Sequence, residues 1–345
     1  MPHLPIVMIG LFLLVSLAGC HTPASPKVDE REGPARAMLG SPEARSVPLL
    51  DGLSGVAVPW SELVSRMCAA DVVLIGELHG HPLGSAAAAA LWEDVLANPG
   101  GVAGGVAAKD RASLSMEFFE RDEQALLDDY LTGLIDEPKL LKASNKDSYP
   151  AYPFGQRAMV NEARAHGVPV VAANSPRIYV RTARLEGYER LRGLTEEQRR
   201  MFRIPDRLPG AESGYRRKFQ EFMLGAGGHG EEPGDQPASS PSASAPTAED
   251  MARVEAGFRS QSLWDWTMAE SVSREFGRGR RPVVHVVGQF HIAREGGLLL
   301  ALREMAPAAR VLTIAVVDAE SSSLREEDRG VADVVVYVGG RGPRG

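Results

Sequence analysis

The chain has 345 residues, of which 44% are hydrophobic and 24% charged, so it holds enough apolar material for one large domain or two. Its formal net charge of −7 and its lack of a polybasic run argue against nucleic acid as a partner. Eight histidines and two cysteines are too few for a zinc-finger or disulfide-rich scaffold.

The N-terminal residues have the pattern of a bacterial export signal. Residues 6–17 are apolar but too few to span a bilayer comfortably, and small residues precede Cys20. The run Leu17-Ala18-Gly19-Cys20 resembles the lipobox of bacterial lipoproteins, which are cleaved before the cysteine and carry lipid on it. We therefore expect a signal peptide over residues 1–19 and acylation of Cys20. The alternative is a plain secretory signal.

A lipid anchor would place the protein in the cell envelope. His21, rather than an aspartate, follows the cysteine, which by analogy with lipoprotein sorting implies the outer membrane, with the protein facing the periplasm. Residues 20–45 are rich in Pro, Ser, Gly and charge, and we expect them to form a flexible tether. No later stretch is long and apolar enough to be a membrane span.

Beyond the tether, strand patterns alternate with helix patterns. Apolar, β-branched runs predict strands at 72–75, 114–118, 169–173, 283–287, 311–317 and 331–338, the last as an edge strand. Helical periodicity appears at 86–97, 122–134, 154–166 and 296–305. This alternation predicts an α/β fold with a mostly parallel central sheet flanked by helices.

An inserted helical lobe is expected between the third and fourth of these strands. Residues 177–277 carry helical periodicity and many charges but little strand signal. Within them, residues 225–250 are of low complexity and too polar to fold, so we expect a disordered loop. The α/β domain accordingly spans 46–318, and residues 319–345 form a C-terminal edge strand and tail.

Two of the predicted strands end in the same pattern, Gly-x-x-His. The motifs are Gly76-Glu77-Leu78-His79 and Gly288-Gln289-Phe290-His291. Loops at the carboxyl ends of parallel strands converge over the ligand-binding crevice of an open sheet. We therefore expect both imidazoles to meet in one site, with Glu77 on the same side of the backbone as His79. Such a site would bind a metal or haem, or perform acid–base chemistry.

Polar residues at other strand ends extend this predicted site. Glu117 is a carboxylate within an apolar run, which is costly unless the group is paired or ligated. Asn174 and Arg177 follow the third strand, and His81 follows the first motif. Each also has a structural alternative: a histidine that is only hydrogen bonded, an ion pair of Glu117 with Arg121, or Asn174 as a helix cap.

Several familiar catalytic motifs are missing from the chain. There is no Gly-x-Ser-x-Gly, no P-loop, no His-Glu-x-x-His, and no Gly-x-Gly-x-x-Gly after a strand. We expect His285, inside its strand, and Cys68 to be buried structural residues.

The two Gly-x-x-His motifs and three further runs resemble the ChaN family. The further runs are Met116-Glu117-Phe118-Phe119-Glu120-Arg121-Asp122-Glu123-Gln124, Pro169-Val170-Val171-Ala172-Ala173-Asn174-Ser175-Pro176-Arg177 and Trp264-Asp265-Trp266-Thr267-Met268-Ala269. The resemblance covers about residues 60–318 without 225–250, and it groups the chain with Tiki and erythromycin-esterase-like proteins in one superfamily. It implies an iron-regulated, haem-binding bacterial lipoprotein for haem and iron acquisition, with a homodimer that encloses stacked haems.

The resemblance does not assign the haem ligand. By side-chain chemistry, His81, Tyr149, Tyr152 and Tyr179 are suitable ligands for haem iron. Binding of haem on an apolar face of the helical lobe is our first hypothesis.

The second hypothesis is a metal-dependent hydrolase, which the wider superfamily implies. In that superfamily, the positions that match Glu77, His79 and His291 hold a divalent cation, so here these residues would bind an ion such as Mn²⁺ or Zn²⁺. The sequence does not decide whether the protein is an enzyme.

In such a hydrolase, further strand-end residues would act on the substrate. Glu117 would be the general base, and Asn174 or Arg177 would stabilise the oxyanion. A third alternative is a vestigial site in a domain that serves only for interactions.

Overall fold

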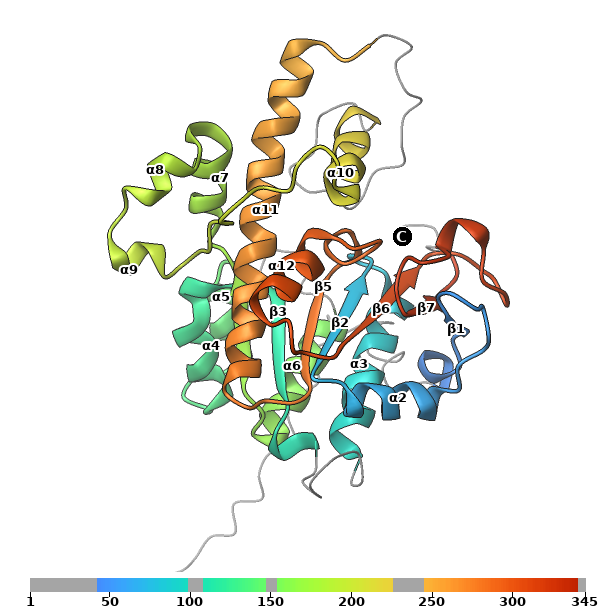
Figure 1. Ribbon diagram of the computed structural model, residues 1–345. Coiled ribbons are helices and arrows are strands. Elements are labelled where there is room, and N and C mark those ends of the chain that lie inside the picture. Colours follow the sequence, from blue (N-terminus) through green and yellow to red (C-terminus); the bar gives the residue numbers. More distant parts are fainter. Residues whose placement is uncertain (1–41, 99–107, 147–153, 226–244, 341–345) are drawn as a thin grey trace, which may run out of the picture. The chain divides into compact units, whose positions relative to one another are not determined.

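A seven-stranded sheet forms the centre of the structure. The structure is a computed structural model and describes residues 42–98, 108–146, 154–225 and 245–340. In spatial order the strands are β1 (Leu49–Asp51), β7 (Val334–Tyr337), β6 (Val311–Val317), β2 (Val72–Glu77), β5 (Val283–Gly288), β3 (Ser113–Glu120) and β4 (Val170–Asn174) (Figure 1). All neighbours are parallel except β1, which runs antiparallel to β7. The predicted α/β fold with a mostly parallel sheet is confirmed.

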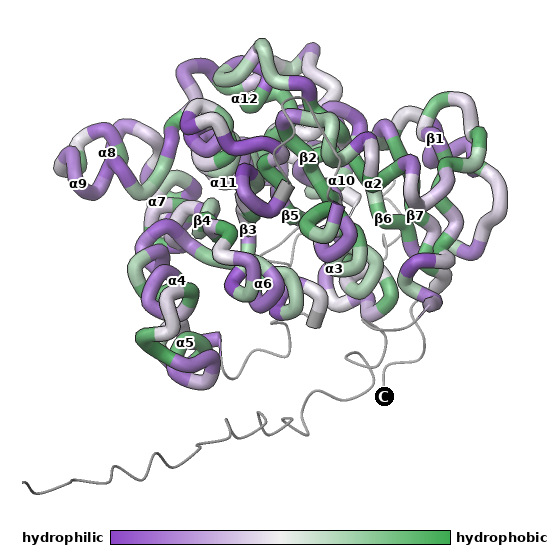
Figure 2. The backbone as a smooth tube through the Cα atoms, turned by 90° about the horizontal axis from the view of Figure 1, so that it is seen from below, coloured by the Kyte–Doolittle hydropathy of each residue, from purple (hydrophilic) through white to green (hydrophobic). Residues whose placement is uncertain are grey.

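Helices cover both faces of the sheet, which explains why its strands are apolar throughout. One layer holds α2 (Trp60–Ala69), α3 (Pro82–Ala97), α4 (Gln124–Leu131), α5 (Glu137–Ala143) and α6 (Phe154–His166), and the other holds α11 (Ala248–Gly277) and α12 (Gly297–Met305). Val73 and Ile75 of β2 pack against the first layer, whereas Val72 and Leu74 pack against the second, as the two-residue period of a strand requires. Figure 2 shows these strands as hydrophobic segments between helices of mixed character.

The helical lobe follows β4, as predicted. It comprises α7 (Arg177–Glu186), α8 (Tyr188–Arg192), α9 (Glu196–Arg199), α10 (Gly214–Gly225) and the first part of α11. Its own apolar cluster includes Val180, Leu191, Phe202 and Leu263. The long helix α11 runs from the lobe to the sheet (Figure 1), and its later residue Val272 packs in one cluster with Val72 of β2 and Val283 of β5.

Two predictions about chain organisation are wrong. The expected loop at 225–250 is too long at both ends: Gly225 belongs to α10, and α11 begins at Ala248, where Thr247 and Asp250 form a reciprocal capping box. The last strand, β7, is not an edge strand, because β1 pairs along its outer side. Residues 226–244 lie outside the described part of the chain.

Short 3₁₀ helices complete the described elements. They are η2 (Pro42–Arg45), η3 (Ala108–Asp110), η4 (Arg121–Glu123), η5 (Gln289–His291) and η6 (Glu326–Asp328). Cys68 and His285 are fully buried, as predicted. Across the described ranges, none of the helices has the length and hydropathy needed to cross a membrane.

Candidate functional site

The two Gly-x-x-His motifs lie side by side at the carboxyl edge of the sheet. β2 and β5 are neighbouring strands in a register that pairs Glu77 with Gly288. A Cβ atom on Gly76 would lie 3.1 Å from Gln289 Cα, and one on Gly288 would lie 3.0 Å from His79 Nε2. Each motif therefore needs its glycine because the other motif packs directly against it.

Glu77 and His79 form the first half of the site. The Glu77 side chain is buried, and its Oε1 lies 3.0 Å from His79 Nδ1 and accepts a hydrogen bond from Gln156 Nε2 of α6. Glu77 Oε2 and Gln156 Oε1 are buried without a hydrogen-bond partner among the described residues. Because buried polar atoms are nearly always satisfied, these two oxygens mark a place where a polar ligand or water would bind.

Glu117, His291 and Asp265 form the second half of the site. His291 Nδ1 lies 2.6 Å from Asp265 Oδ1, and its Nε2 lies 3.3 Å from Glu117 Oε1. Glu117 Oε2 accepts a hydrogen bond of 2.6 Å from Gly288 N, and Asp265 accepts one from the Tyr215 hydroxyl. The two halves meet at Gly288, since a Cβ atom added to this glycine would also lie 3.6 Å from Glu117 Oε2.

The two carboxylates around His291 hold it as an imidazolium. Burial alone would lower the pKa of His291, but Asp265 and Glu117 raise it from 6.5 to about 10. Burial alone would raise the pKa of Glu117, but the charge and hydrogen bond of His291 lower it from 4.5 to about 2. A general base works best with a pKa near the working pH, so the expected role of Glu117 as general base is not supported.

These shifts predict how stability depends on pH. The raised pKa of His291 contributes stability fully below pH 6.5, and this contribution is lost as the pH rises through about 10. The lowered pKa of Glu117 contributes stability above pH 4.5 that is lost as the pH falls through about 2. We expect urea denaturation to show the alkaline decline in the wild type and a smaller decline in His291→Gln. The exposed His166 is the control: His166→Gln should keep the wild-type profile, and an equal effect of both variants would contradict the assignment.

The expected metal site is not assembled. Both ring nitrogens of His291 face carboxylates, whereas a metal-ligating imidazole is neutral and offers a free nitrogen. Within the described ranges, no group of three or more His, Cys, Asp or Glu residues could hold a metal ion. The structure therefore does not support Glu77, His79 and His291 as a common set of ligands.

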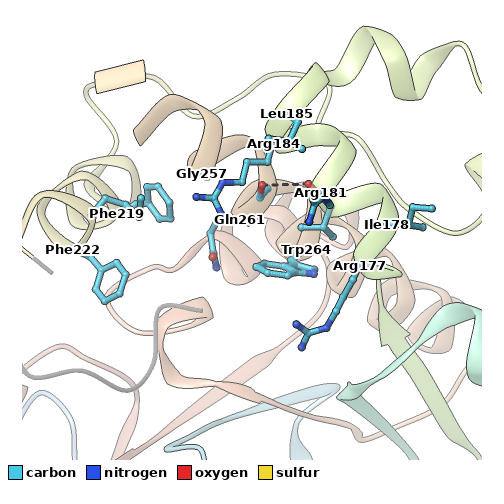
Figure 3. A pocket seen from close by; sticks show the side chains of 13 residues that line it. Arg177, Ile178, Arg181, Arg184, Leu185, Phe219, Phe222, Gly257, Gln261 and Trp264 are labelled. Atoms are coloured by element: carbon cyan, nitrogen blue, oxygen red, sulfur yellow. Dashed lines mark hydrogen bonds between the residues drawn. The ribbon is translucent and has the colours of Figure 1, made fainter. Parts of the chain in front are cut away.

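A second feature, which we call the lobe pocket, is a cavity of about 630 Å³ between α7, α10 and α11 (Figure 3). Its apolar lining consists of Ile178, Val180, Leu185, Phe219, Phe222, Met223 and Trp264. Arg177, Arg181 and Arg184 line it from α7, spaced so that they share one helix face, and Figure 3 shows Arg184 extending across the pocket. Gln261 also lines the pocket, and its Nε2 lies 3.1 Å from His291 Nδ1. The lobe pocket and the polar site are therefore neighbours.

Comparison with known proteins identifies the family. The profile described as "Haem-binding uptake, Tiki superfamily, ChaN" matches residues 63–302, which is more than half of the chain. The chain belongs to this ChaN family. A comparison with curated proteins finds no match.

Solved structures resemble this ChaN-family chain in fold, at low sequence identity. ChaN of Campylobacter jejuni, described with cofacial haem binding, has a TM-score of 0.59 at 14% identity, over 84% of this chain and 96% of that one. A mutant of the erythromycin esterase EreC in its open conformation has a TM-score of 0.44 at 13% identity, over 83% and 95%. The type III effector HopBA1 has a TM-score of 0.38 at 14% identity, over 87% and 99%.

The candidate haem ligands that the structure describes lie away from the lobe pocket of this ChaN-family chain. His81 caps α3, where its Nδ1 accepts a main-chain N–H at 3.1 Å, and its Nε2 lies 3.1 Å from the Gly339 carbonyl. Tyr179 packs against Phe202 in the core of the lobe, with ring centroids 4.9 Å apart. Cys20, Tyr149 and Tyr152 lie outside the described residues.

The two expected oxyanion groups lie at the start of the lobe. Asn174 Oδ1 accepts a hydrogen bond from the following main-chain N–H at 2.9 Å. Arg177 is exposed, its Nε lies 3.5 Å from Glu120 Oε1, and it lines the lobe pocket. The structure thus assigns Arg177 to the pocket and Asn174 to the turn after β4.

Sequence reasoning missed the partners that orient the site. Asp265 is fully buried beside His291, and a Cβ on Gly297 would lie only 2.1 Å from its Oδ2. Gln156 and Gln261 reach the two halves from α6 and α11. Asp265 did carry a signal, because a carboxylate between two tryptophans in an apolar helix face must find a partner. Gln156 and Gln261 carried no such signal in the sequence.

Proposed function

We propose that the protein binds haem in the lobe pocket. The observation that carries this proposal is an aromatic cavity with three arginines along one wall. Haem is a flat, largely apolar ring with two carboxylate groups, so it would bury the ring against Trp264 and Phe222 and direct its carboxylates to the guanidinium groups. Family membership supports the same ligand.

The lining also offers one ligand for haem iron. Of the residue types that ligate haem iron, Met223 is the one that the described lining supplies. Met223 belongs to α10, and its Cε would lie 3.5 Å from a Cβ atom on Gly257, close to Phe219 Cζ at 3.1 Å from the same point. We propose Met223 as the ligand in place of His81 and Tyr179.

A hemin titration of the full chain tests the proposal. We expect a saturable shift of the Soret band. The double variant Arg181→Ala/Arg184→Ala should bind hemin about tenfold more weakly, since each lost charge-assisted hydrogen bond is worth about 1.5–3 kcal/mol before solvent screening. Arg190→Ala on α8, an exposed arginine paired with Glu186, is the control and should bind like the wild type. No saturable shift would refute the proposal.

The cellular role follows from the same proposal. We propose that Cys20 is acylated at the outer membrane, facing the periplasm, and that the protein serves haem and iron acquisition. Ile178 and Leu185 at the pocket rim are 68% and 66% exposed, and a second copy of the chain would cover them. Palmitate labelling of wild type and Cys20→Ala tests the anchor, and sedimentation with and without hemin tests the homodimer.

Acid–base hydrolysis is the second function that we propose, and the first half of the polar site favours it. His79 is partly exposed, and the hydrogen bond from its Nδ1 to Glu77 orients the ring. The buried Glu77 Oε2 has no partner in the described part of the chain. An imidazole held in this way can act as a general base, so His79 replaces Glu117 in that role.

Ester hydrolysis by the full chain tests the second function. We expect p-nitrophenyl acetate to be hydrolysed above background and His79→Ala to lower kcat/KM by roughly 10²- to 10⁴-fold, the usual contribution of a general base. His166→Ala should keep the wild-type rate. Hydrolysis that persists in His79→Ala, or that never exceeds background, would exclude this function.

A further inference from the structure

A second cavity, of about 800 Å³, lies at the edge of the sheet beside β4, and its wall is rich in arginine. We call it the arginine cavity. The β4 strand separates α4 from α11 at this place (Figure 2). Six guanidinium groups line the cavity: Arg111, Arg121, Arg200, Arg274, Arg278 and Arg280. They are concentrated there although the chain as a whole has a net charge of −7.

Three carboxylates, Asp110, Asp128 and Glu275, line the same cavity, so its lining still carries more positive than negative groups. Arg121 and Arg274 share a single oxygen, Glu270 Oε2, at 2.9 and 3.0 Å. Arg278 pairs with Glu275, and Arg200 pairs with Glu196 at 2.8 Å. Arg280 has no hydrogen bond or ion pair of its side chain within the described part of the chain.

Burial and neighbouring positive charges disfavour the charged forms of two of these arginines. Burial lowers the pKa of Arg121 to about 10, and the charge of Arg274 acts in the same direction. Burial also lowers the pKa of Arg111, with a further contribution from Arg281. Arg111 donates to main-chain oxygens, including Cys68 O at 3.3 Å. A bound anion would relieve this repulsion.

Favourable interaction with the dipole of α11 does not explain why all six arginines line the arginine cavity. Arg274 and Arg278 lie at the C-terminal end of α11, where positive charge is favourable. Arg111, Arg121 and Arg200, however, come from three other segments, and they converge on the same cavity. Arg121 also donates to the main-chain oxygen of Arg200 at 3.1 Å, which holds these segments together.

An extended peptide is not the occupant. The Gln124 side chain pairs with the outer edge of β4: its Nε2 donates to Val170 O at 3.0 Å, and its Oε1 accepts from Ala172 N at 2.7 Å. The main-chain groups that a further strand would need there are therefore taken.

We propose that the arginine cavity binds a phosphorylated ligand that carries at least two phosphate groups. Each phosphate brings up to two charges and several acceptor oxygens in a small volume, which matches closely spaced guanidinium forks better than a single carboxylate does. The ligand is either a soluble phosphorylated molecule or the headgroup of a phospholipid. The proposal does not depend on haem binding, because the cavity shares no lining residue with the lobe pocket.

Calorimetric titration of the full chain with pyrophosphate, at constant ionic strength, tests the proposal. Arg274→Ala/Arg280→Ala should bind at least about tenfold more weakly than the wild type, since the variant removes charge-assisted hydrogen bonds. Both side chains can be removed without touching the buried Arg121, and an unchanged melting temperature verifies the fold. The matched control is Arg303→Ala. Arg303 is an exposed arginine of α12 that pairs with Glu295, and its removal should leave binding as in the wild type.

A second arm identifies the source of the phosphate. Co-sedimentation with phosphatidylcholine vesicles that contain phosphatidic acid, lost in the double variant, would support a lipid headgroup, whereas calorimetric binding alone would support a soluble ligand. Absence of binding in both arms would overturn the proposal. So would equal weakening by Arg303→Ala, or wild-type affinity in the double variant.

Discussion

Replacing Asp265 with alanine is expected to destabilise the protein by about 3–5 kcal/mol, the usual effect of removing one partner of a buried ion pair. Asp265 is 0% exposed, and its carboxylate accepts hydrogen bonds from His291 and from Tyr215. The substitution leaves the His291 imidazolium buried with only Glu117 as a charged partner. Urea denaturation at pH 6 measures the change in the free energy of unfolding.

Two variants show whether the effect arises from the buried charge. Asp206 is an exposed aspartate that pairs with Arg203 on the surface, and Asp206→Ala should change stability by at most about 0.5 kcal/mol. Tyr215→Phe removes one hydrogen bond to Asp265 and should cost about 1–2 kcal/mol. In Asp265→Asn, the pKa of His291 should fall, because the charge of Asp265 raises it more than that of Glu117 does. A loss below about 1 kcal/mol in Asp265→Ala would refute the structural role of the Asp265–His291 pair.

Filling the lobe pocket at Gly257 is expected to weaken hemin binding by roughly ten- to hundredfold. A Cβ atom on Gly257 would already lie 3.1 Å from Phe219 Cζ and 3.5 Å from Met223 Cε, so the rest of a leucine side chain would enter the pocket. The stated loss of affinity corresponds to about 1.4–2.8 kcal/mol of binding free energy, from haem contacts that the leucine side chain obstructs. A Soret titration of Gly257→Leu measures it.

The same helix offers a matched control. Gly257 lies inside α11, where leucine favours the helix by about 0.8 kcal/mol over glycine, so the variant should keep its fold. Ala252 is exposed on α11 and does not line the pocket, and Ala252→Leu should bind hemin like the wild type. If Gly257→Leu retained wild-type affinity, haem would have to bind elsewhere.

The secondary structure was largely readable from local patterns. The helix at 154–166 and the strand at 311–317 agree with the structure residue for residue. The helix has a clear period and ends at Gly167, with φ +66°, whereas the strand is a short apolar, β-branched run. β1 escaped prediction because three residues are too few to show a period. Without β1, the final strand looked like an edge.

The sequence by itself determined the fold class and singled out Glu77, His79, Glu117 and His291, because an apolar strand that ends in a polar group is a local signal. Only the tertiary structure decided what these groups do. Asp265 is contributed by α11, and its contact with His291 turns a presumed metal ligand into a buried imidazolium. Which side chains meet, and therefore which are charged, depends on how distant segments pack, and no local pattern records that.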